Sequence, residues 1–393
     1  MTRWSYMVTE TTTRSVIARH VPMTGVSFSD GLMDAGGSFQ GSFDIGRKEF
    51  AEWISGDQLR RVIWPCRDGA PQGAYLFTAV PSTDAAATTQ QIRGVRLDWL
   101  FGYRAITKTL TFNAIDQNRI VRDLFRFGMG LRTSYCSPNQ RLEDNVLAAA
   151  QIPWIRLDDT LSGVLRDRKE TTGNRDDGYP GASRKIVAQM VKNLTALRDE
   201  SGTKGPEYRW LYGLAADGLP EMVLDTAGPS FTVGRPESAA QVTFEFPGGR
   251  QGTVDSAAYG SDGTTMVTRG HVLGQQQDSS TPVGIATYDY LLALGFPLID
   301  KVASESGVQD EGVLAAKAAG LLWAADDAWA LAFDGGGNPQ WGSYQLGDWV
   351  ILRVRQGRTP LRRSMRITGW SVAVDDSGRR EKVTPTVQVG RWF

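Results

Sequence analysis

The stretch that decides the fold lies near the C-terminus and reads SMRITGWSVAV (364–374), DDSG (375–378) and KVTPTVQV (382–389). Apolar and polar residues alternate along the two outer segments, which is the pattern of half-buried β-strands. The middle segment is made of residues that favour tight turns, so together the three predict a β-hairpin. A further strand is expected just upstream, at 348–354. This end of the chain is therefore predicted to be antiparallel β-structure.

Turn-rich β-structure is also predicted near the start of the chain, from Val21 to about Val80. Strand-like runs at 38–43, 61–64 and 74–77 are separated by clusters of Gly, Asp and Pro. Such spacing favours a small antiparallel barrel or sandwich. One short helix is expected to interrupt the strands at 47–54, where apolar residues share one face.

The middle of the chain differs in kind from the turn-rich start. A polar segment at 81–89 indicates a linker or loop. Asp116 is placed to cap a helix over 116–128, and a second helix is expected over about 183–198. Two strands, at 208–214 and 221–224, are predicted to follow. This region is therefore α+β.

Beyond residue 242 the turn-rich β pattern resumes, with an alanine-rich helix expected over about 310–323. The fold class predicted for the whole chain is α+β, mainly β. A chain of 393 residues is too long for one ordinary core, so two or three domains are expected. The changes in pattern predict domains at 1–90, 91–240 and 241–393.

Composition excludes several classes of function. The 43 basic and 43 acidic residues cancel, so no global field attracts nucleic acid or an anionic membrane. No apolar run is long enough for a membrane helix, and the first residues lack the features of a secretion signal. The two cysteines, Cys66 and Cys136, are too few for a disulfide framework or a structural zinc site. One disulfide between them stays open, although two free thiols are favoured.

The residues offer little material for catalysis. The chain holds two histidines, His20 and His271, and neither occurs in a metal-ligand spacing. Both are interpreted as surface or structural histidines. The acidic pairs Asp158-Asp159 and Asp326-Asp327 could hold a metal or act as a glycosidase pair, but caps and solvated charges are the favoured interpretation. No catalytic, cofactor-binding or metal-binding residue is therefore predicted.

Four other features have structural interpretations. Gly335–Gly337 precedes no Lys-Ser or Lys-Thr, so a turn is favoured over a phosphate loop. The glycosylation-like Asn193-Leu194-Thr195 falls on a predicted helix. The 12 tryptophans are scattered, which favours core or interface packing over a sugar platform. The basic stretch 355–366 could face nucleic acid or an acidic neighbour, but a solvated loop between strands is favoured; its arginines are Arg355, Arg358, Arg362, Arg363 and Arg366.

Three stretches carry a resemblance to a known family. They are Val95–Ile106, the alanine-rich helix at 310–323, and Gly347-Asp348-Trp349-Val350 followed by Arg366–Val372 and the closing hairpin. Their order resembles that of minor tail proteins of siphophages that infect actinobacteria. The resembled group is the tail-tip hub or tail-associated family, which is related to the baseplate hubs of contractile phages.

The resemblance implies a virion protein without enzymatic activity. It implies two small, tail-tube-like β-barrels, at 1–90 and 241–393, on either side of an α/β domain. It also implies a homotrimer at the tail tip that joins tube to tip and opens for genome ejection during host-cell entry. The implied partners are other copies of the chain, a distal tail ring protein, a tape measure protein and other minor tail proteins, with DNA passing transiently. Synthesis would take place in the bacterial cytoplasm, without stable membrane insertion or a cofactor.

Two rival hypotheses remain beside the structural hub. A receptor- or glycan-binding tail protein is suggested by the aromatic content. An enzyme acting on cell-wall polymer is the third, and it lacks an acid–base constellation in the sequence.

Overall fold

The structure is a computed structural model of the 393-residue chain. It describes residues 3–44, 46, 58–81, 87–106, 110–131, 151–170, 186–196, 205–230, 232–246, 254–264, 266–275, 280–305, 308–322, 326–334, 339–355 and 361–388. The predicted helix at 47–54 lies outside these residues, as do Gly335–Gly337 and Cys136.

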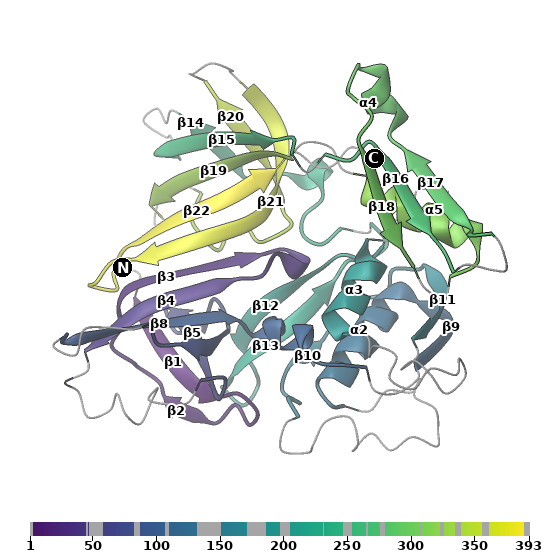
Figure 1. The fold of residues 1–393 in the computed structure, drawn as a ribbon. Helices are drawn as coiled ribbons and strands as arrows, with labels where there is room; N and C mark the ends of the chain where they lie inside the picture. The colour runs from purple at the N-terminus through teal and green to yellow at the C-terminus, as the bar shows by residue number, and fades with distance from the viewer. Residues whose placement is uncertain are drawn as a thin grey trace.

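Most strands of the described chain join one large sheet (Figure 1). Its fourteen strands are β1 Trp4–Glu10, β2 Val16–Ala18, β3 Thr24–Gly31, β4 Ser38–Asp44, β5 Arg61–Arg67, β6 Ala70–Pro71, β7 Tyr75–Ala79, β8 Thr89–Arg96, β14 Thr243–Phe246, β15 Ser256–Asp262, β19 Asp326–Asp334, β20 Trp349–Val354, β21 Leu361–Val374 and β22 Glu381–Gln388. Their order is β15-β19-β22-β21-β3-β4-β8-β7-β5-β1-β2, with β6 beside β5, β20 beside β21, and β14 beside β20. The path is open: its end strands, β15 and β2, do not pair with each other.

Period-2 patterning accounts for the strands at the C-terminal end. In β22, Val383 and Val387 are fully buried, Lys382 is exposed, and Thr384 and Thr386 at the alternate positions are half-buried. The buried positions of β20, β21 and β22 share one core with those of β1, β3, β4, β7 and β8. One hydrophobic core therefore underlies both ends of the chain, and burial of these apolar side chains is the dominant stabilising term.

The middle of the chain packs around a second core. Its elements are η2 Leu97–Gly102, β9 Leu110–Asp116, α2 Gln117–Gly128, β10 Arg156–Leu157, β11 Leu165–Glu170, α3 Val187–Thr195, β12 Tyr208–Leu214 and β13 Pro220–Thr226. Strands β10, β13 and β12 form a small sheet, and β9 pairs with β11. Phe125 of α2 meets Phe101 and Trp210 with ring centroids 4.9 and 5.3 Å apart. Asp116 caps α2 by accepting from the amide of Asn118 at 2.9 Å.

A smaller unit, the inserted module (residues 266–322), leaves the large sheet between β15 and β19. Its elements are β16 Arg269–Leu273, β17 Val283–Thr287, α4 Asp289–Ala293, β18 Asp300–Ser304 and α5 Glu311–Leu321. The order of its sheet is β17-β16-β18, with α5 on one face. Because β15 and β19 pair directly, the module is an excursion from a hairpin of the large sheet. In Figure 1 it is the green unit that stands apart from the yellow and purple strands.

The predicted fold class, α+β and mainly β, is confirmed. The helices expected at 116–128, 183–198 and 310–323 correspond to α2, α3 and α5, and the strands expected at both ends and in the middle are present. The closing hairpin is β21 and β22. Closure into two barrels and division at 90 and 240 stay predictions; β8 continues from residue 89 across the first of these boundaries.

Several elements were missed for physical reasons. In β1 five of seven residues are buried, so the strand is covered on both faces and shows no alternation for a period-2 reading to find. Strands β16 and β17 each carry a glycine, Gly270 and Gly284, that interrupts the apolar pattern. A Cβ on Gly284 would lie 2.0 Å from the backbone of Leu314 in α5. Close approach of helix to sheet thus requires the residue that hides these strands.

Candidate functional site: the seam between the two ends of the chain

The two ends of the chain meet where β3 pairs with β21. Residues 27–31 of β3 pair antiparallel with residues 369–373 of β21, a contact we call the seam. Further bonds fasten the surrounding segments. The Trp4 amide donates to the Gly378 carbonyl at 2.8 Å, and the Gly25 amide donates to Asp376 Oδ1 at 2.8 Å. A residue near the start therefore joins the turn of the last hairpin.

A buried ion pair strengthens this junction. Glu381 of β22 accepts from Trp4 Nε1 at 2.6 Å and lies 2.8 Å from the Arg67 guanidinium of β5. Glu381 is 4 % exposed, so its charge is shielded from water. The Arg67 guanidinium also lies over the Trp341 ring, 5.7 Å from its centroid. Because a buried charge without its partner is costly, removing either end would destabilise the junction.

A bulge in β21 shapes the seam. The register shifts between Ile367 and Gly369, so Thr368 is the additional residue. Its carbonyl accepts from the Leu32 amide at 3.0 Å, just beyond the end of β3. A Cβ on Gly369 would lie 3.2 Å from the Asp30 carbonyl oxygen, so a larger residue would push the paired strands apart. Bulges of this kind bend a strand and interrupt its ladder.

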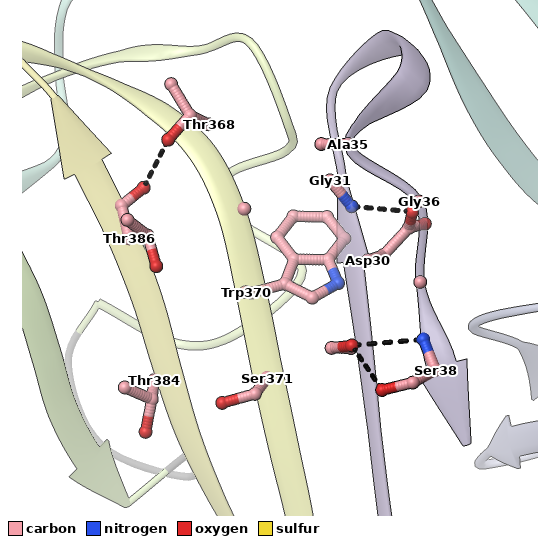
Figure 2. A pocket seen from close by; sticks show the side chains of 13 residues that line it. Asp30, Gly31, Ala35, Gly36, Ser38, Thr368, Trp370, Ser371, Thr384 and Thr386 are labelled. Carbon is pink, nitrogen blue, oxygen red and sulfur yellow. Dashed lines mark hydrogen bonds between the residues drawn. The ribbon is translucent and has the colours of Figure 1, made fainter. Parts of the chain in front are cut away.

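A shallow pocket of about 710 Å³ lies at this bulge (Figure 2). Figure 2 shows Trp370 between β21 and the β3–β4 hairpin, with Ser38, Ser371, Thr384 and Thr386 around it. Almost all of the lining residues are small or carry hydroxyl groups: Ser29, Asp30, Gly31, Ala35, Gly36, Gly37, Ser38, Thr368, Gly369, Trp370, Ser371, Thr384 and Thr386. The lining holds no histidine, cysteine or lysine, and Asp30 is its one charged residue. General acid–base chemistry has little to work with here.

The Asp30 carboxylate is fixed inside the protein by a buried network. Arg96, 1 % exposed, donates to Asp30 Oδ1 at 2.5 Å and to Asp98 at 2.7 Å through both Nε and Nη2. The Tyr212 hydroxyl donates to Asp30 Oδ2 at 2.7 Å, and Trp210 Nε1 donates to Asp98 at 3.1 Å. The network therefore ties β3 and β8 of the large sheet to β12 of the middle region.

Burial and charge act in opposite directions on these groups. Burial raises the pKa of Asp30, although the Arg96 guanidinium and the hydroxyl of Tyr212 act against it. Burial lowers the pKa of Arg96, but the Asp98 and Asp30 carboxylates raise it more, and the net direction is upward. Arg96 is therefore a permanent cation, and the geometry is that of a structural crosslink.

A second network ties the middle region to the C-terminal strands. Arg366 of β21 donates to both Glu207 oxygens, at 2.9 and 2.6 Å, and to the Val233 carbonyl at 3.0 Å. Arg209 of β12 pairs with Asp225 at 2.6 Å and donates to the Leu346 carbonyl at 2.6 Å. The bidentate Arg366–Glu207 contact fixes orientation as well as distance.

Most of the residues considered for chemistry lie apart from the seam. His20 is exposed, and His271 bonds to Asp300 at 3.0 Å on the inserted module. Asp158 accepts from the amide and hydroxyl of Thr226, at 3.1 and 2.9 Å, so it anchors a loop, while Asp159 is exposed. Asp326 and Asp327 begin β19. Within the described residues, no group of three or more His, Cys, Asp or Glu is arranged to hold a metal ion.

The remaining predicted features can be placed as well. Cys66 is buried, and burial raises the pKa of its thiol to about 12, so it stays protonated and unreactive. Asn193 lies on α3, as predicted. In the basic stretch, Arg355 pairs with Glu245 and Arg366 with Glu207, so these two are internal contacts, whereas Arg362 and Arg363 are exposed.

The tryptophans of the described chain are mainly packing residues. Trp4, Trp64, Trp210 and Trp341 are buried, which agrees with the favoured interpretation. Trp99 is the exception at 38 % exposure, and its ring lies 4.3 Å from that of Tyr103. Both belong to the turn at the end of η2.

The residues that organise the seam were not identified from the sequence, although a sign of them was present. On β3, Asp30 lies two residues after the buried Phe28, and on β8, Arg96 lies four residues after the buried Ile92. Because side chains an even number of positions apart share a face of a strand, both charged residues face the core. A charge at a core-facing position requires a buried partner. What the sequence cannot supply is the pairing of Asp30 with Arg96, 66 residues away.

The fold and the seam define a class first: a mainly-β protein whose two ends are joined in one sheet. Comparison with solved structures shows that the chain shares its fold with tail proteins, two of them from prophages. The tail protein from Neisseria meningitidis MC58 matches with a TM-score of 0.55 and 10 % identity, over 99 % of this chain and 97 % of that chain. The 43 kDa tail protein of prophage MuSo2 from Shewanella oneidensis gives 0.56 and 11 %, over 98 % of each.

The prophage tail protein gp18 from Listeria monocytogenes EGD-e gives a TM-score of 0.51 at 10 % identity, over 98 % of this chain and 94 % of that chain. By sequence, no family model and no curated protein matches the chain. In the described residues, no helix is long and apolar enough to cross a membrane. At these identities the likeness establishes the fold.

Proposed function

We propose that this chain is a non-enzymatic structural subunit of a phage tail tip: a hub that joins the tail tube to the tip and opens for genome ejection. The observation that carries the proposal is the likeness to tail proteins along almost the whole of both chains. Such a likeness extends to the order of the regions and not only to one common motif. A tail hub of a siphophage, present in three copies, is the finer form of the proposal.

The contacts at the seam support a role in which the subunit keeps its shape under force. A hub must keep its shape while tube, tip and passing DNA exert force on it. Here the two ends of the chain are held in one sheet, with Glu381 and Arg96 each at the centre of a buried ion pair. Rupture of the seam would require these charges to be separated inside the protein, which is unfavourable. Rigidity within the subunit leaves opening to movement between subunits.

The surface at the seam also suits a path for DNA. Its lining is dominated by Gly, Ser and Thr, and the one charge in it, Asp30, is bound to Arg96. Strong contacts to phosphate come from exposed Lys and Arg, which would retard passage. We propose that 1–90 and 241–393 supply the tube-like part of the hub and 91–240 the outer part. The proposed partners are further copies, a distal tail ring protein, a tape measure protein and other minor tail proteins.

The experiment that tests the hub is a cryo-EM map of the virion combined with subunit stoichiometry. Three copies at the tail tip are expected. Absence of the protein from the tail tip would contradict the proposal. Release of soluble fragments from purified cell wall by the protein would contradict its non-enzymatic part.

A second candidate function, binding of a receptor or glycan, is favoured by one observation. Trp99 and Tyr103 form an exposed aromatic pair, and such faces can stack on sugar rings. Binding of the purified protein to host envelope glycans, lost in Trp99→Ala but not in Trp370→Phe at the seam, would support this candidate. Equal glycan binding by the wild type, Trp99→Ala and Trp370→Phe would contradict a role for the Trp99–Tyr103 pair.

A further inference from the structure

Exposed large hydrophobic residues are concentrated in the inserted module. Eight of the fifteen exposed large hydrophobic residues in the described chain fall between residues 283 and 313, so the exposure is local. On the sheet of the module, Val283, Ile285 and Val302 point away from α5 and are 37, 54 and 61 % exposed. Ile285 and Val302 flank His271 in adjacent strands, at matching register positions. On this face the exposed apolar side chains therefore lie beside His271 and the Arg269–Asp300 ion pair.

The most exposed part is the loop that joins β17 to β18. We call residues 290–298 the apolar loop; the whole stretch from Tyr290 to Ile299 holds no charged residue. Its exposed members are Tyr290 at 66 %, Leu294 at 58 %, Phe296 at 40 % and Leu298 at 49 %. Large contiguous apolar patches are rare on monomeric proteins and mark interaction sites.

The apolar loop is held in one shape by backbone bonds. Phe296 N donates to the Leu291 carbonyl at 3.1 Å, closing the turn at Gly295, whose φ is +88°. Thr268, which is fully buried, accepts from the Ile299 amide at 2.7 Å and donates to the Pro297 carbonyl at 3.0 Å. An ordered loop loses little conformational entropy when it docks, so it is pre-organised for binding.

Charge decides between the occupants of this surface. Residues 266–322 contain three cations and six anions, a net charge of −3, and since the whole chain is neutral the remainder carries +3. Loops that dock on anionic membranes are flanked by Lys and Arg. Here the charges that flank the loop are Asp289, Asp300 and Lys301, which sum to −1, and Arg269 is paired with Asp300 at 2.5 Å. A second copy of this chain, in contrast, offers a body of opposite charge, with Arg362 and Arg363 exposed on β21.

We infer that the inserted module is an intersubunit hook: the apolar loop of one copy docks on the body of a second copy, near the start of β21, where Arg362 and Arg363 are exposed. The two contacting surfaces differ, so the contact is heterologous, and a heterologous contact that closes on itself forms a ring. The inference rests on the proposed hub only in requiring self-association, and it assigns the surface that produces it.

The test compares the molar mass of four full-length proteins by sedimentation and light scattering at about 10–50 μM, the range in which interfaces of standard size associate. The loop variant is Leu294→Asp with Phe296→Asp. Its matched control, Leu161→Asp with Leu214→Asp, places the same charges on two exposed leucines elsewhere, at 55 and 49 % exposure. All four positions are exposed, so unchanged circular dichroism is expected in both variants.

The wild type and the control are expected to self-associate, and the loop variant to associate at least tenfold more weakly. Arg362→Glu with Arg363→Glu is expected to weaken association more at low salt than at high salt. Equal association of the loop variant and the wild type would overturn the hook while leaving the hub proposal intact. A monomeric wild type over this range would also overturn the hook, whereas the hub is judged by the virion map.

Discussion

The seam and the inserted module solve the problem of stability in opposite ways. At the seam and in the networks beside it, side chains from distant parts of the chain meet: Trp4 with Glu381, Arg96 with Asp30, Arg366 with Glu207. Each of these contacts is buried or partly buried, and the core beneath joins both ends of the chain. The module has a core of three buried residues, Val272, Leu314 and Ala318. Its apolar side chains largely face outward.

This difference teaches where each part finds its stabilising contacts. The body that contains the seam pairs the buried charges of its networks within one chain: Glu381 with Arg67, and Asp30 and Asp98 with Arg96. The module leaves Ile285, Val302, Tyr290 and Leu294 exposed to water. These apolar side chains are the ones that the inferred contact with a second copy would bury. The buried networks of the body and the exposed apolar surface of the inserted module thus lie in separate parts of the fold, so each can be altered by its own substitutions.

The largest effect, on the free energy of unfolding, is expected from Arg96→Ala, which removes the cation of the buried network between β3, β8 and β12. The change leaves Asp30 and Asp98 without their cation in the interior, and such a loss costs about 3–5 kcal/mol of unfolding free energy. Urea unfolding followed by tryptophan fluorescence measures it. Arg93→Ala is the matched control, because Arg93 lies on the same strand but is exposed. Equal stability of the two variants would show that the network does not hold the seam.

A second, smaller effect is expected from Leu314→Ala in the module. Leu314 is fully buried among few neighbours, so truncation costs about 2–4 kcal/mol. Because the module is joined to the body through a hairpin, we expect local loosening of β16, β17 and α5 while the seam stays protected. Hydrogen exchange by mass spectrometry resolves the two regions. Val313→Ala, at an adjacent exposed position, is the control, and uniform loss of protection in seam and module would contradict their independence.

The same contrast explains what could be predicted from the sequence. The closing hairpin, α2 with its Asp116 cap, and the mainly-β class depend on local patterns, so they could be read directly. The seam depends on contacts such as Gly25 with Asp376, 351 residues apart, for which the sequence holds no local signal. Only the helix of the module was predicted from the sequence. Strands β16 and β17 were missed because Gly270 and Gly284, which allow them to pack closely on α5, interrupt their apolar pattern.

The candidate site divides in the same way. The interpretation of His20, Asp158 and the tryptophans as structural follows from residue type and neighbourhood; His20 is exposed, Asp158 accepts from Thr226, and Trp4, Trp64, Trp210 and Trp341 are buried. Asp30 and Arg96 could have been singled out, because each places a charge on a core-facing position of a strand. Their assembly with Tyr212 into one network depends on tertiary structure, and periodicity carries no information about it.

The smallest effect is expected from Asp123→Asn on α2. This change tests whether a buried charge of the body that lies outside the seam is as well paired as those at the seam. Burial raises the pKa of Asp123 from 3.8 to about 6, although Arg126, Arg119 and Arg122 lower it. The stability that belongs to the neutral carboxyl is fully present below pH 3.8 and is lost as pH rises through about 6. At pH 7 the wild type therefore carries a destabilising carboxylate that the amide lacks.

Asp123→Asn is expected to raise the unfolding free energy at pH 7 by about 1–2 kcal/mol, and this gain should shrink as the pH is lowered to 4.5. Urea unfolding at both values of pH measures the difference. Asp159→Asn, at an exposed position, is the control and should show no such dependence. A gain that is the same at both pH values would mean that shape, and not charge, separates the two side chains. A loss at pH 7 would mean that the arginines of α2 hold this carboxylate as firmly as Arg96 holds Asp30, and that buried charge is equally well matched throughout the body.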